Sequence, residues 1–200
     1  GKWFDEMSVG KNLANYDSLL VLTHFKGHVM GGFGGSNKNI GIGCADGRIG
    51  KGMIHTVEGS DNLWSIAEEE LMERITESTK SVVDHFGENI VFINVLRNMS
   101  VSCDCEGVGA APVVTPNIGI VASTDILAAD QASVDLVYTL KDSDHKDLVE
   151  RIETRHGLRQ LSYMKEMHMG NDRYHLINID ESDKEILPAD AVKNVKPFRR

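Results

Sequence analysis

The sequence lacks the features that mark several large classes of protein. Its 200 residues include only 4 prolines and 3 cysteines, and no run of about 18 apolar residues could cross a membrane as a helix. Lys and Arg number 21 against 30 Asp and Glu, so the formal net charge is −9, and basic residues gather only in the short segment Lys193–Arg200. A nucleic-acid partner and a membrane-spanning segment are therefore both disfavoured.

Cysteine is scarce and unsuited to disulfide bonding. Cys44, Cys103 and Cys105 are odd in number, and a bond between two residues only two positions apart would be strained. The segment Gly1–Glu6 also lacks the charged-then-apolar pattern of a signal peptide. We therefore expect reduced thiols and a cytoplasmic protein. A [4Fe–4S] cluster needs four cysteines, so one chain cannot build it from cysteine alone and would need a second subunit, as in a homodimer.

The apolar patterns that are present predict an α/β fold. The alternation of strands and helices favours a mixed, largely parallel sheet flanked by helices, in a single domain over 1–200 whose last residues, 181–200, form a peripheral tail. A long helix is expected to begin at a cap formed by Ser60 and Asp61 and to end at Gly87. The expected strands are 19–23, 89–96, 118–122 and 174–179, and the other expected helices are 126–140, capped by Thr124 and Asp125, and a polar pair over 144–168.

A glycine-rich loop follows the first expected strand. Residues 26–52 contain ten of the 19 glycines, but Phe33, Ile40 and Ile42 interrupt them, which is not typical of a flexible linker. We expect an ordered loop with one short helix. Neither a phosphate-binding P-loop nor a dinucleotide-binding glycine pattern occurs in it.

Part of this loop has the composition of an anion-binding cradle. Gly34, Gly35, Ser36, Asn37 and Lys38 combine a permissive backbone with a cationic side chain. Successive backbone N–H groups beside a lysine can hold a phosphate, a carboxylate or the tail of a cofactor. The alternative is a turn that merely requires glycine.

Potential metal ligands follow two of the expected strands. His24 and His28 are four residues apart, which places them on one side of either a helix or a strand, and Cys103 and Cys105 follow the second strand. Because binding sites of open α/β sheets lie beyond the carboxyl ends of the strands, both pairs could face one crevice. Imidazole and thiolate groups favour transition metals such as Zn, Fe or Ni. The alternatives are hydrogen-bonded or exposed histidines and two reduced thiols.

Asp130 is a polar residue within an otherwise apolar helical pattern. A buried carboxylate requires a partner. We expect this partner to be a Lys or Arg of the glycine-rich loop.

Three strings of residues resemble one family. VLTHFKGHVMGGFGGSNKNIGIGCA (21–45), FINVLRNMSVSCDCEG (92–107) and IGIVASTDILAADQASVDLV (118–137) together look like the domain-of-unknown-function family 362, in the order that this family has them. The resemblance extends over about 15–179. Members of this family are often labelled iron–sulfur centre proteins, and they commonly carry a ferredoxin-like insert of cysteine motifs after the position of His55. Here residues 56–80 contain no cysteine, so the chain resembles a short form without that insert.

A second similarity involves the glycine-rich loop alone. Residues 32–38 are similar to a Gly-Phe-Ser-Gly-Gly-Arg-Lys pattern of the nickel-dependent lactate racemase, where the loop tethers a cofactor downstream of a catalytic histidine. This resemblance implies that Lys38 contacts a cofactor and that His24 or His28 transfers a proton.

The sequence thus leads to one main hypothesis and two alternatives. The main hypothesis is a metal or an anionic metallocofactor held by His24, His28, Cys103 and Cys105, with the loop ending at Lys38 binding a small anionic group. The first alternative is a non-catalytic module that partners a separate ferredoxin. The second is a racemase-type or redox enzyme acting on a small molecule, and the sequence does not decide whether the protein is an enzyme.

Overall fold

The fold is known from a computed structural model that describes residues 1–57, 59–60, 62 and 65–198. The strands are β1 (Leu19–His24), β2 (Lys26–His28), β3 (Gly32–Gly34), β4 (Ile90–Leu96), β5 (Gly119–Ser123), β6 (Leu176–Asn178) and β7 (Lys184–Ile186). The α-helices are α1 (Ser36–Gly43), α2 (Gly50–His55), α3 (Glu68–Phe86), α4 (Ile126–Thr139), α5 (Asp142–Thr154), α6 (Arg159–Glu166) and α7 (Pro188–Val192). The short 3-10 helices are η1 (Leu13–Asn15), η3 (Asp104–Gly109) and η4 (Ile179–Glu181).

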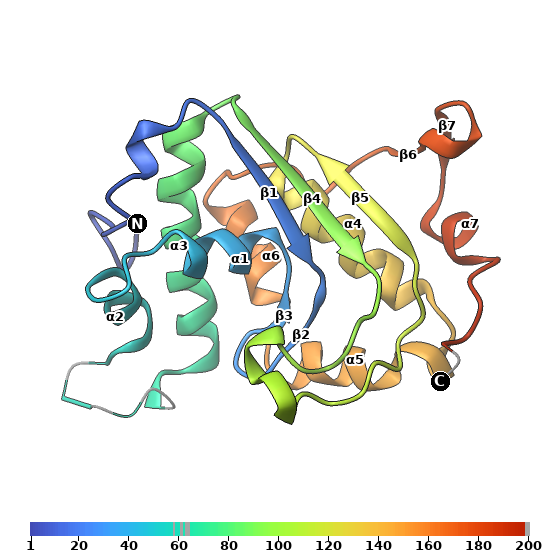
Figure 1. The fold of residues 1–200 in the computed structure, drawn as a ribbon, viewed down its shortest axis with the longest axis horizontal. Helices are drawn as coiled ribbons and strands as arrows, with labels where there is room; N and C mark the ends of the chain where they lie inside the picture. The colour runs from blue at the N-terminus through green and yellow to red at the C-terminus, as the bar shows by residue number, and fades with distance from the viewer. Residues whose placement is uncertain (58, 61, 63–64, 199–200) are drawn as a thin grey trace.

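The central sheet confirms the mixed α/β fold. Its strand order is β1-β4-β5, with β1 and β4 parallel and β4 and β5 antiparallel (Figure 1). The strands β2 and β3 form a hairpin beyond the carboxyl end of β1, and β6 pairs with β7 in a separate hairpin. Because β1 and β4 are parallel, the segments that follow them leave the sheet at the same end.

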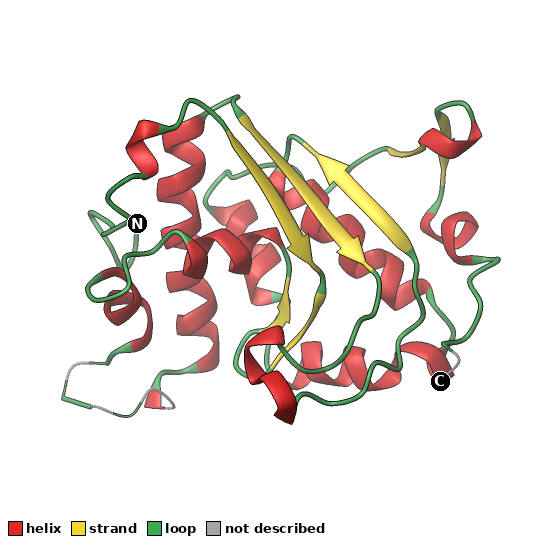
Figure 2. Cartoon of the chain, viewed as in Figure 1, coloured by secondary structure: helices red, strands yellow, loops and turns green. Residues whose placement is uncertain are grey.

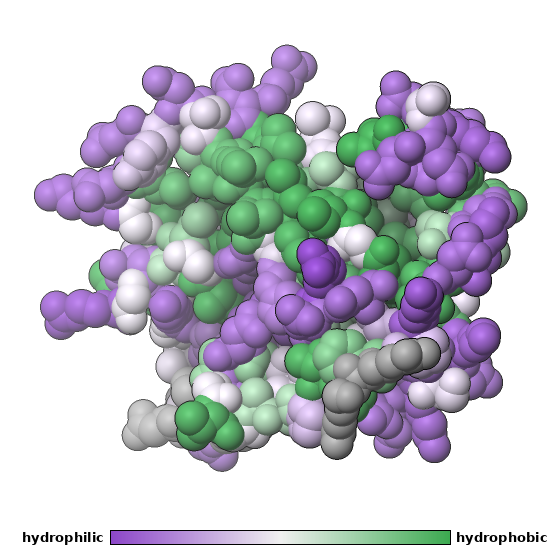
Figure 3. All heavy atoms as spheres, turned by 45° about the vertical axis from the view of Figure 1, so that its right-hand side comes forward, coloured by the Kyte–Doolittle hydropathy of each residue, from purple (hydrophilic) through white to green (hydrophobic). Residues whose placement is uncertain are grey.

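One face of the sheet is packed and the other is open. Val21 of β1 and Phe92 of β4 are buried on the packed face, where α1 and α4 contact the sheet (Figure 2). On the opposite face Leu20 and Leu22 are each 62% exposed and Ile120 is 65% exposed. Figure 3 shows a continuous hydrophobic area over this part of the molecule. We call the side chains of Leu20, Leu22, Val91, Ile93, Val95, Ile120 and Ala122 the open face.

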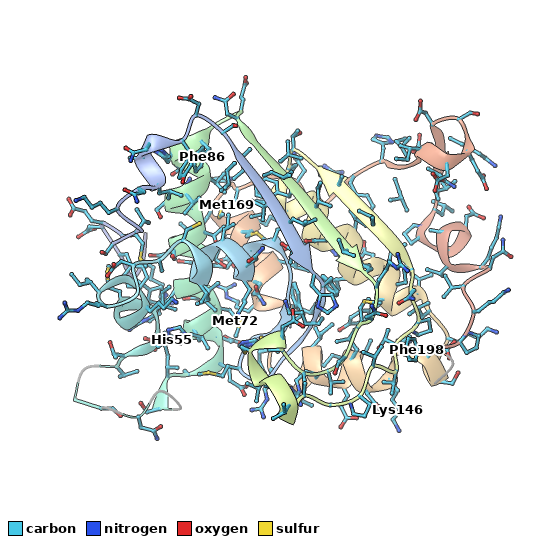
Figure 4. All side chains as sticks on the ribbon, in the orientation of Figure 1. His55, Met72, Phe86, Lys146, Met169 and Phe198 are labelled. Atoms are coloured by element: carbon cyan, nitrogen blue, oxygen red, sulfur yellow. The ribbon has the colours of Figure 1, made fainter. Side chains whose placement is uncertain are left out.

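The helix α3 connects the glycine-rich region to the core. A Cβ atom at Gly41 would lie 2.6 Å from the carbonyl oxygen of Ile75, so α1 and α3 approach each other almost backbone to backbone. Met72 lies in the lower half of α3 and Phe86 at its upper end (Figure 4), and both side chains are buried. The close approach at Gly41 fixes α1 between α3 and the sheet.

Several expected boundaries are confirmed and others are wrong. The carboxylate of Asp125 caps α4 by accepting the N–H of Ala128 at 2.9 Å, as expected. The long helix instead begins at Glu68 after Ala67, without a side-chain cap. Ser60 lies before it in a local turn, where its hydroxyl accepts the N–H of Asn62. Asp61, the other expected cap residue, lies outside the described residues.

The glycine-rich region is more regular than expected. Instead of a loop with one short helix, it forms the hairpin of β2 and β3 followed by the two helices α1 and α2. The expected tail carries β7 and α7, and α7 packs against α4. Within the described residues, every helix is too short or too polar to cross a lipid bilayer.

Candidate metal centre

The structure brings three of the predicted ligands together. One ligand atom each of His28, Cys103 and Cys105 lies within 4.8 Å of the other two. His28 ends β2, whereas the two cysteines flank the start of η3, which follows β4. The side chain of Cys103 is buried, at 4% exposure, and Cys105 is exposed, so the group lies at the protein surface with one side open. We call these three residues the donor group.

Gly27 allows the two segments to meet. Its N–H donates to the carbonyl oxygen of Ser100 at 2.7 Å, and a Cβ atom at this position would collide with the backbone carbonyl of Val101. Any side chain would therefore push β2 away from the loop that carries the cysteines. The glycine between Lys26 and His28 in the sequence is thus a requirement for forming the donor group.

The cysteine loop is held in shape by its own hydrogen bonds. Glu106 accepts the N–H of Cys103 at 2.8 Å and the hydroxyl of Ser102 at 2.8 Å, while the Cys103 Sγ accepts the N–H of Cys105 at 3.3 Å. Burial and the neighbouring Cys103 raise the pKa of Cys105, and Lys38 opposes this rise. These hydrogen bonds therefore fix the backbone of the loop and the position of the Cys103 Sγ atom.

His28 is buried and neutral. Burial, followed by the positive charges of Lys38 and Lys26, lowers the pKa of His28 from 6.5 to about 3. Its Nδ1 atom accepts the N–H of Gly31 at 2.9 Å and, more weakly, the N–H of Met30 at 3.3 Å. A ring that is neutral at physiological pH meets the first requirement for a metal ligand, because no proton has to be displaced from an imidazolium.

Positive charge surrounds the donor group. Lys38 is half-buried and has no hydrogen-bond or ion-pair partner among the described residues, although it is close enough to shift the pKa of both His28 and Cys105. Lys26 is engaged, since its Nζ donates to the carbonyl of His24 at 2.8 Å and pairs with Asp104 at 3.2 Å. Arg151 donates to the carbonyl of Val101 at 3.1 Å. Lys38 is therefore the cation available to a ligand.

His24 does not join the donor group. Its Nδ1 lies 3.0 Å from both carboxylate oxygens of Asp104, and its Nε2 lies 2.8 Å from the carbonyl oxygen of Arg97. Both ring nitrogens are thus engaged with oxygen atoms. His24 and Lys26 instead hold Asp104, which lies between the two cysteines, and so help to position η3.

Two backbone N–H groups of the predicted anion cradle donate to a carboxylate of the same chain. Asp130 accepts the backbone N–H groups of Ser36 at 2.7 Å and Asn37 at 2.9 Å, at the start of α1. The side-chain amide of Asn94 donates to the same carboxylate at 2.8 Å. A Cβ atom at Gly35 would lie 2.5 Å from Asp130 Oδ1, which explains this glycine. The expected Lys or Arg partner of Asp130 was therefore wrong, because backbone and side-chain amides take that role.

The five predicted cradle residues consequently separate. Gly35, Ser36 and Asn37 face Asp130 in the interior. Gly34 lies beside the side chains of Lys26 and Lys38, with a Cβ position 3.5 Å from Lys26 Cε and 3.9 Å from Lys38 Cδ. Lys38 alone of the five offers a charged group near the donor group.

The interior cluster includes polar residues to which the sequence alone assigns no role in the glycine-rich region. Asn94 accepts the hydroxyl of Ser36 at 2.8 Å, and the amide of Asn37 donates to Thr76 at 3.0 Å and to Gln160 at 3.1 Å. Asn94 could have been found, because it is the one polar residue in the apolar run of β4. Gln160 lies in a polar segment and gives no such signal.

Comparison with known proteins is decisive at the level of the family. Residues 1–135 match the family model described as Domain of unknown function (DUF362). The chain belongs to this family. The match covers the first two strings of family-like residues, most of the third, the donor group, Lys38 and Asp130. No curated protein and no solved structure matches the chain.

The iron–sulfur label often given to DUF362 proteins would imply a [4Fe–4S] cluster, and the cysteines of a single chain do not fit one. Cys44, the third cysteine, is half-buried against the core at the end of α1 and is not part of the donor group. Two cysteines and one histidine are too few protein ligands for a [4Fe–4S] cluster held by four cysteines. His55, at the end of α2 (Figure 4), hydrogen-bonds to the carbonyl of Lys51 at 2.9 Å and also lies outside the group.

Proposed function

We propose that the protein binds a transition metal, or an anionic metallocofactor, through Cys103, Cys105 and His28. The observation that carries this proposal is the convergence of their ligand atoms within 4.8 Å. Two sulfur donors and one imidazole suit Zn, Fe or Ni. Three protein ligands leave one position of a four-coordinate metal free, as in metal sites that bind a further ligand.

Lys38 supports a small anion as that further ligand. Its ammonium group is half-buried, acts on both His28 and Cys105, and has no ion-pair partner among the described residues. An anion bound to the metal would give this charge a partner at short range, where charge-assisted hydrogen bonds are strongest. We therefore assign Lys38 the role of holding an anionic ligand or the anionic part of a cofactor.

The test is the metal content of protein purified without oxygen. Wild-type protein dialysed against zinc, nickel or ferrous iron is expected to retain about one equivalent of at least one metal, and the double variant Cys103→Ala, Cys105→Ala to lose it. The matched control Cys44→Ala should retain the metal because Cys44 does not belong to the donor group. Substoichiometric metal in wild-type protein under every condition would contradict the proposal.

A second candidate function is docking of a separate, acidic ferredoxin-like protein. Lys26, Lys38 and Arg151 all act on His28 and outnumber the two neighbouring carboxylates of Asp104 and Glu106, so this surface carries more positive than negative charge in a chain whose net charge is −9. Such a local patch would steer an acidic partner toward this surface. Binding of an acidic ferredoxin that weakens with salt and with Lys38→Met, in protein free of metal, would favour this function over the first.

A racemase-type activity fits less well. It would use His24 or His28 for proton transfer, but both ring nitrogens of His24 are engaged with oxygen atoms of Asp104 and Arg97. A pKa of about 3 makes the His28 ring a weak base at neutral pH, and its Nδ1 accepts backbone N–H groups. We place the protein in the cytoplasm because all three cysteines are free and a reducing compartment would keep them so.

A further inference from the structure

The turn between β2 and β3 is tied to a proposed metal ligand. His28 is the last residue of β2, and the turn 29–31 leads to Gly32 at the start of β3. Two N–H groups of this turn, those of Gly31 and Met30, point at the Nδ1 atom of His28. The Nδ1 atom of the ring thus accepts hydrogen bonds from the turn. In metal-bound histidines the second ring nitrogen usually donates its hydrogen to a carbonyl or a carboxylate instead.

This arrangement conflicts with metal binding for a simple chemical reason. The Nδ1 atom of a neutral imidazole has a single lone pair in the plane of the ring, and the Gly31 N–H uses it. A metal bound to Nδ1 would take that lone pair. A metal bound to Nε2 of a neutral ring would require the hydrogen on Nδ1, which would then face the Gly31 hydrogen. In either case the bond between Gly31 and His28 is lost.

We infer that metal binding at His28 releases the N–H groups of Met30 and Gly31, so that the turn between β2 and β3 changes conformation when the metal site is filled. This inference rests on the proposed metal-binding function. It extends that function by making the backbone of the turn a sensor of metal occupancy.

The other side of the turn stays anchored. The side-chain amide of Gln160 donates to the carbonyl oxygens of Gly31 at 2.9 Å and Phe33 at 3.1 Å, and Gln160 itself accepts the amide of Asn37. Gly32, with a φ of +73°, packs against Gly157, where a Cβ atom would lie 2.7 Å from the Gly157 Cα. The change is therefore confined to the N–H groups of Met30 and Gly31, while the hairpin keeps its position.

The hydrogen bond also sets a limit on affinity. Since binding must break it, the metal binds roughly fivefold more weakly than it would to the same ligands without this bond, given about 1 kcal/mol for an ordinary hydrogen bond. Half-filling the site therefore needs about fivefold more free metal than the same ligands would need without this bond.

The experiment follows the two ring nitrogens and the turn amides directly by NMR, at neutral pH, with zinc as the probe. In metal-free protein labelled with ¹⁵N, the His28 ring, assigned with a His28→Gln variant, is expected to show an unprotonated Nδ1 and a protonated Nε2. Saturating zinc should change this pattern, and should speed hydrogen exchange at the Met30 and Gly31 amides about tenfold or more, as expected when a protecting hydrogen bond is lost. The amide of Phe33, which donates to the Gly31 carbonyl at 2.8 Å, should remain unchanged.

The double variant Cys103→Ala, Cys105→Ala serves as the matched control, in which zinc should alter none of these signals. Zinc that binds to wild-type protein, measured by dialysis, yet leaves the His28 ring and both amides unchanged would overturn this inference and leave the proposed function standing. Failure of zinc, nickel and ferrous iron to bind to wild-type protein would overturn both.

Discussion

The glycine-rich segment serves two polar clusters of opposite character. The interior cluster, formed by Asp130 with Ser36, Asn37 and Asn94, brings a carboxylate together with three N–H donors of the same chain. The donor group and Lys38 lie at the surface, and the lysine has no such partner in the described structure. The interior cluster therefore stabilises the fold, whereas the donor group and Lys38 are available to bind a ligand.

We expect the largest loss of stability when the interior cluster loses its carboxylate. Asp130→Ala should lower the free energy of unfolding by about 3–5 kcal/mol, because it leaves two buried backbone N–H groups without their acceptor and removes one of the acceptors of the Asn94 amide. Urea denaturation measures this change. A loss below about 1 kcal/mol would show that water replaces the carboxylate and that the cluster is not a structural requirement.

Zinc bound to the donor group should have the next largest effect on the free energy of unfolding. Free zinc at about 100 times its dissociation constant should stabilise wild-type protein by about 2.7 kcal/mol. The double variant Cys103→Ala, Cys105→Ala should fold normally and gain nothing. Urea denaturation with and without buffered zinc makes the comparison, and equal gains in both proteins would place the zinc elsewhere.

Gly27→Ala should affect both stability and the site. The added methyl group meets the backbone of Val101, so the free energy of unfolding should fall by about 1–3 kcal/mol and metal binding should weaken, since β2 and the cysteine loop are pushed apart. Gly52→Ala is the control, because a Cβ atom there has no neighbour within 4 Å among the described residues. Unchanged metal affinity in Gly27→Ala would show that the loop adjusts.

The smallest effect on stability is expected for Lys38→Met. Removing an unpaired ammonium group should change the free energy of unfolding by no more than about 0.5 kcal/mol. The zinc-loaded variant should nevertheless bind a small carboxylate such as oxalate about tenfold more weakly than wild-type protein, since a charge-assisted hydrogen bond is lost. Calorimetry can measure this difference, and Lys38→Arg should retain most of the affinity. Equal affinity in all three proteins would remove Lys38 from the ligand site.

The sequence predicts the fold and part of the site for identifiable reasons. Apolar runs placed β1 and β4 correctly, and their parallel arrangement made it possible to expect that His28 would meet Cys103 and Cys105. His24 was paired with His28 by its spacing. The chain bends at Phe25 between β1 and β2, however, so the two histidines do not share the face of one strand.

The interior cluster shows a different limit. The composition of residues 34–38 indicated backbone donors for an anion, but it could not show that a carboxylate of the same chain, 94 residues after Ser36, accepts them. Local sequence describes the donors of a hydrogen bond, whereas the acceptor is supplied by tertiary packing. Buried carboxylates such as Asp130 should therefore be considered first when a cradle has no bound ligand.

The open face of the sheet has a consequence for how the protein behaves at high concentration. Leu20 and Leu22 lie on β1, an edge strand whose outer backbone groups are not paired in the sheet. Exposed apolar edge strands favour association between molecules, and a net charge of −9 opposes it by mutual repulsion. Near pH 5.3, the isoelectric point of the sequence, that repulsion vanishes. Acidification to this pH should therefore cause the folded protein to aggregate and precipitate.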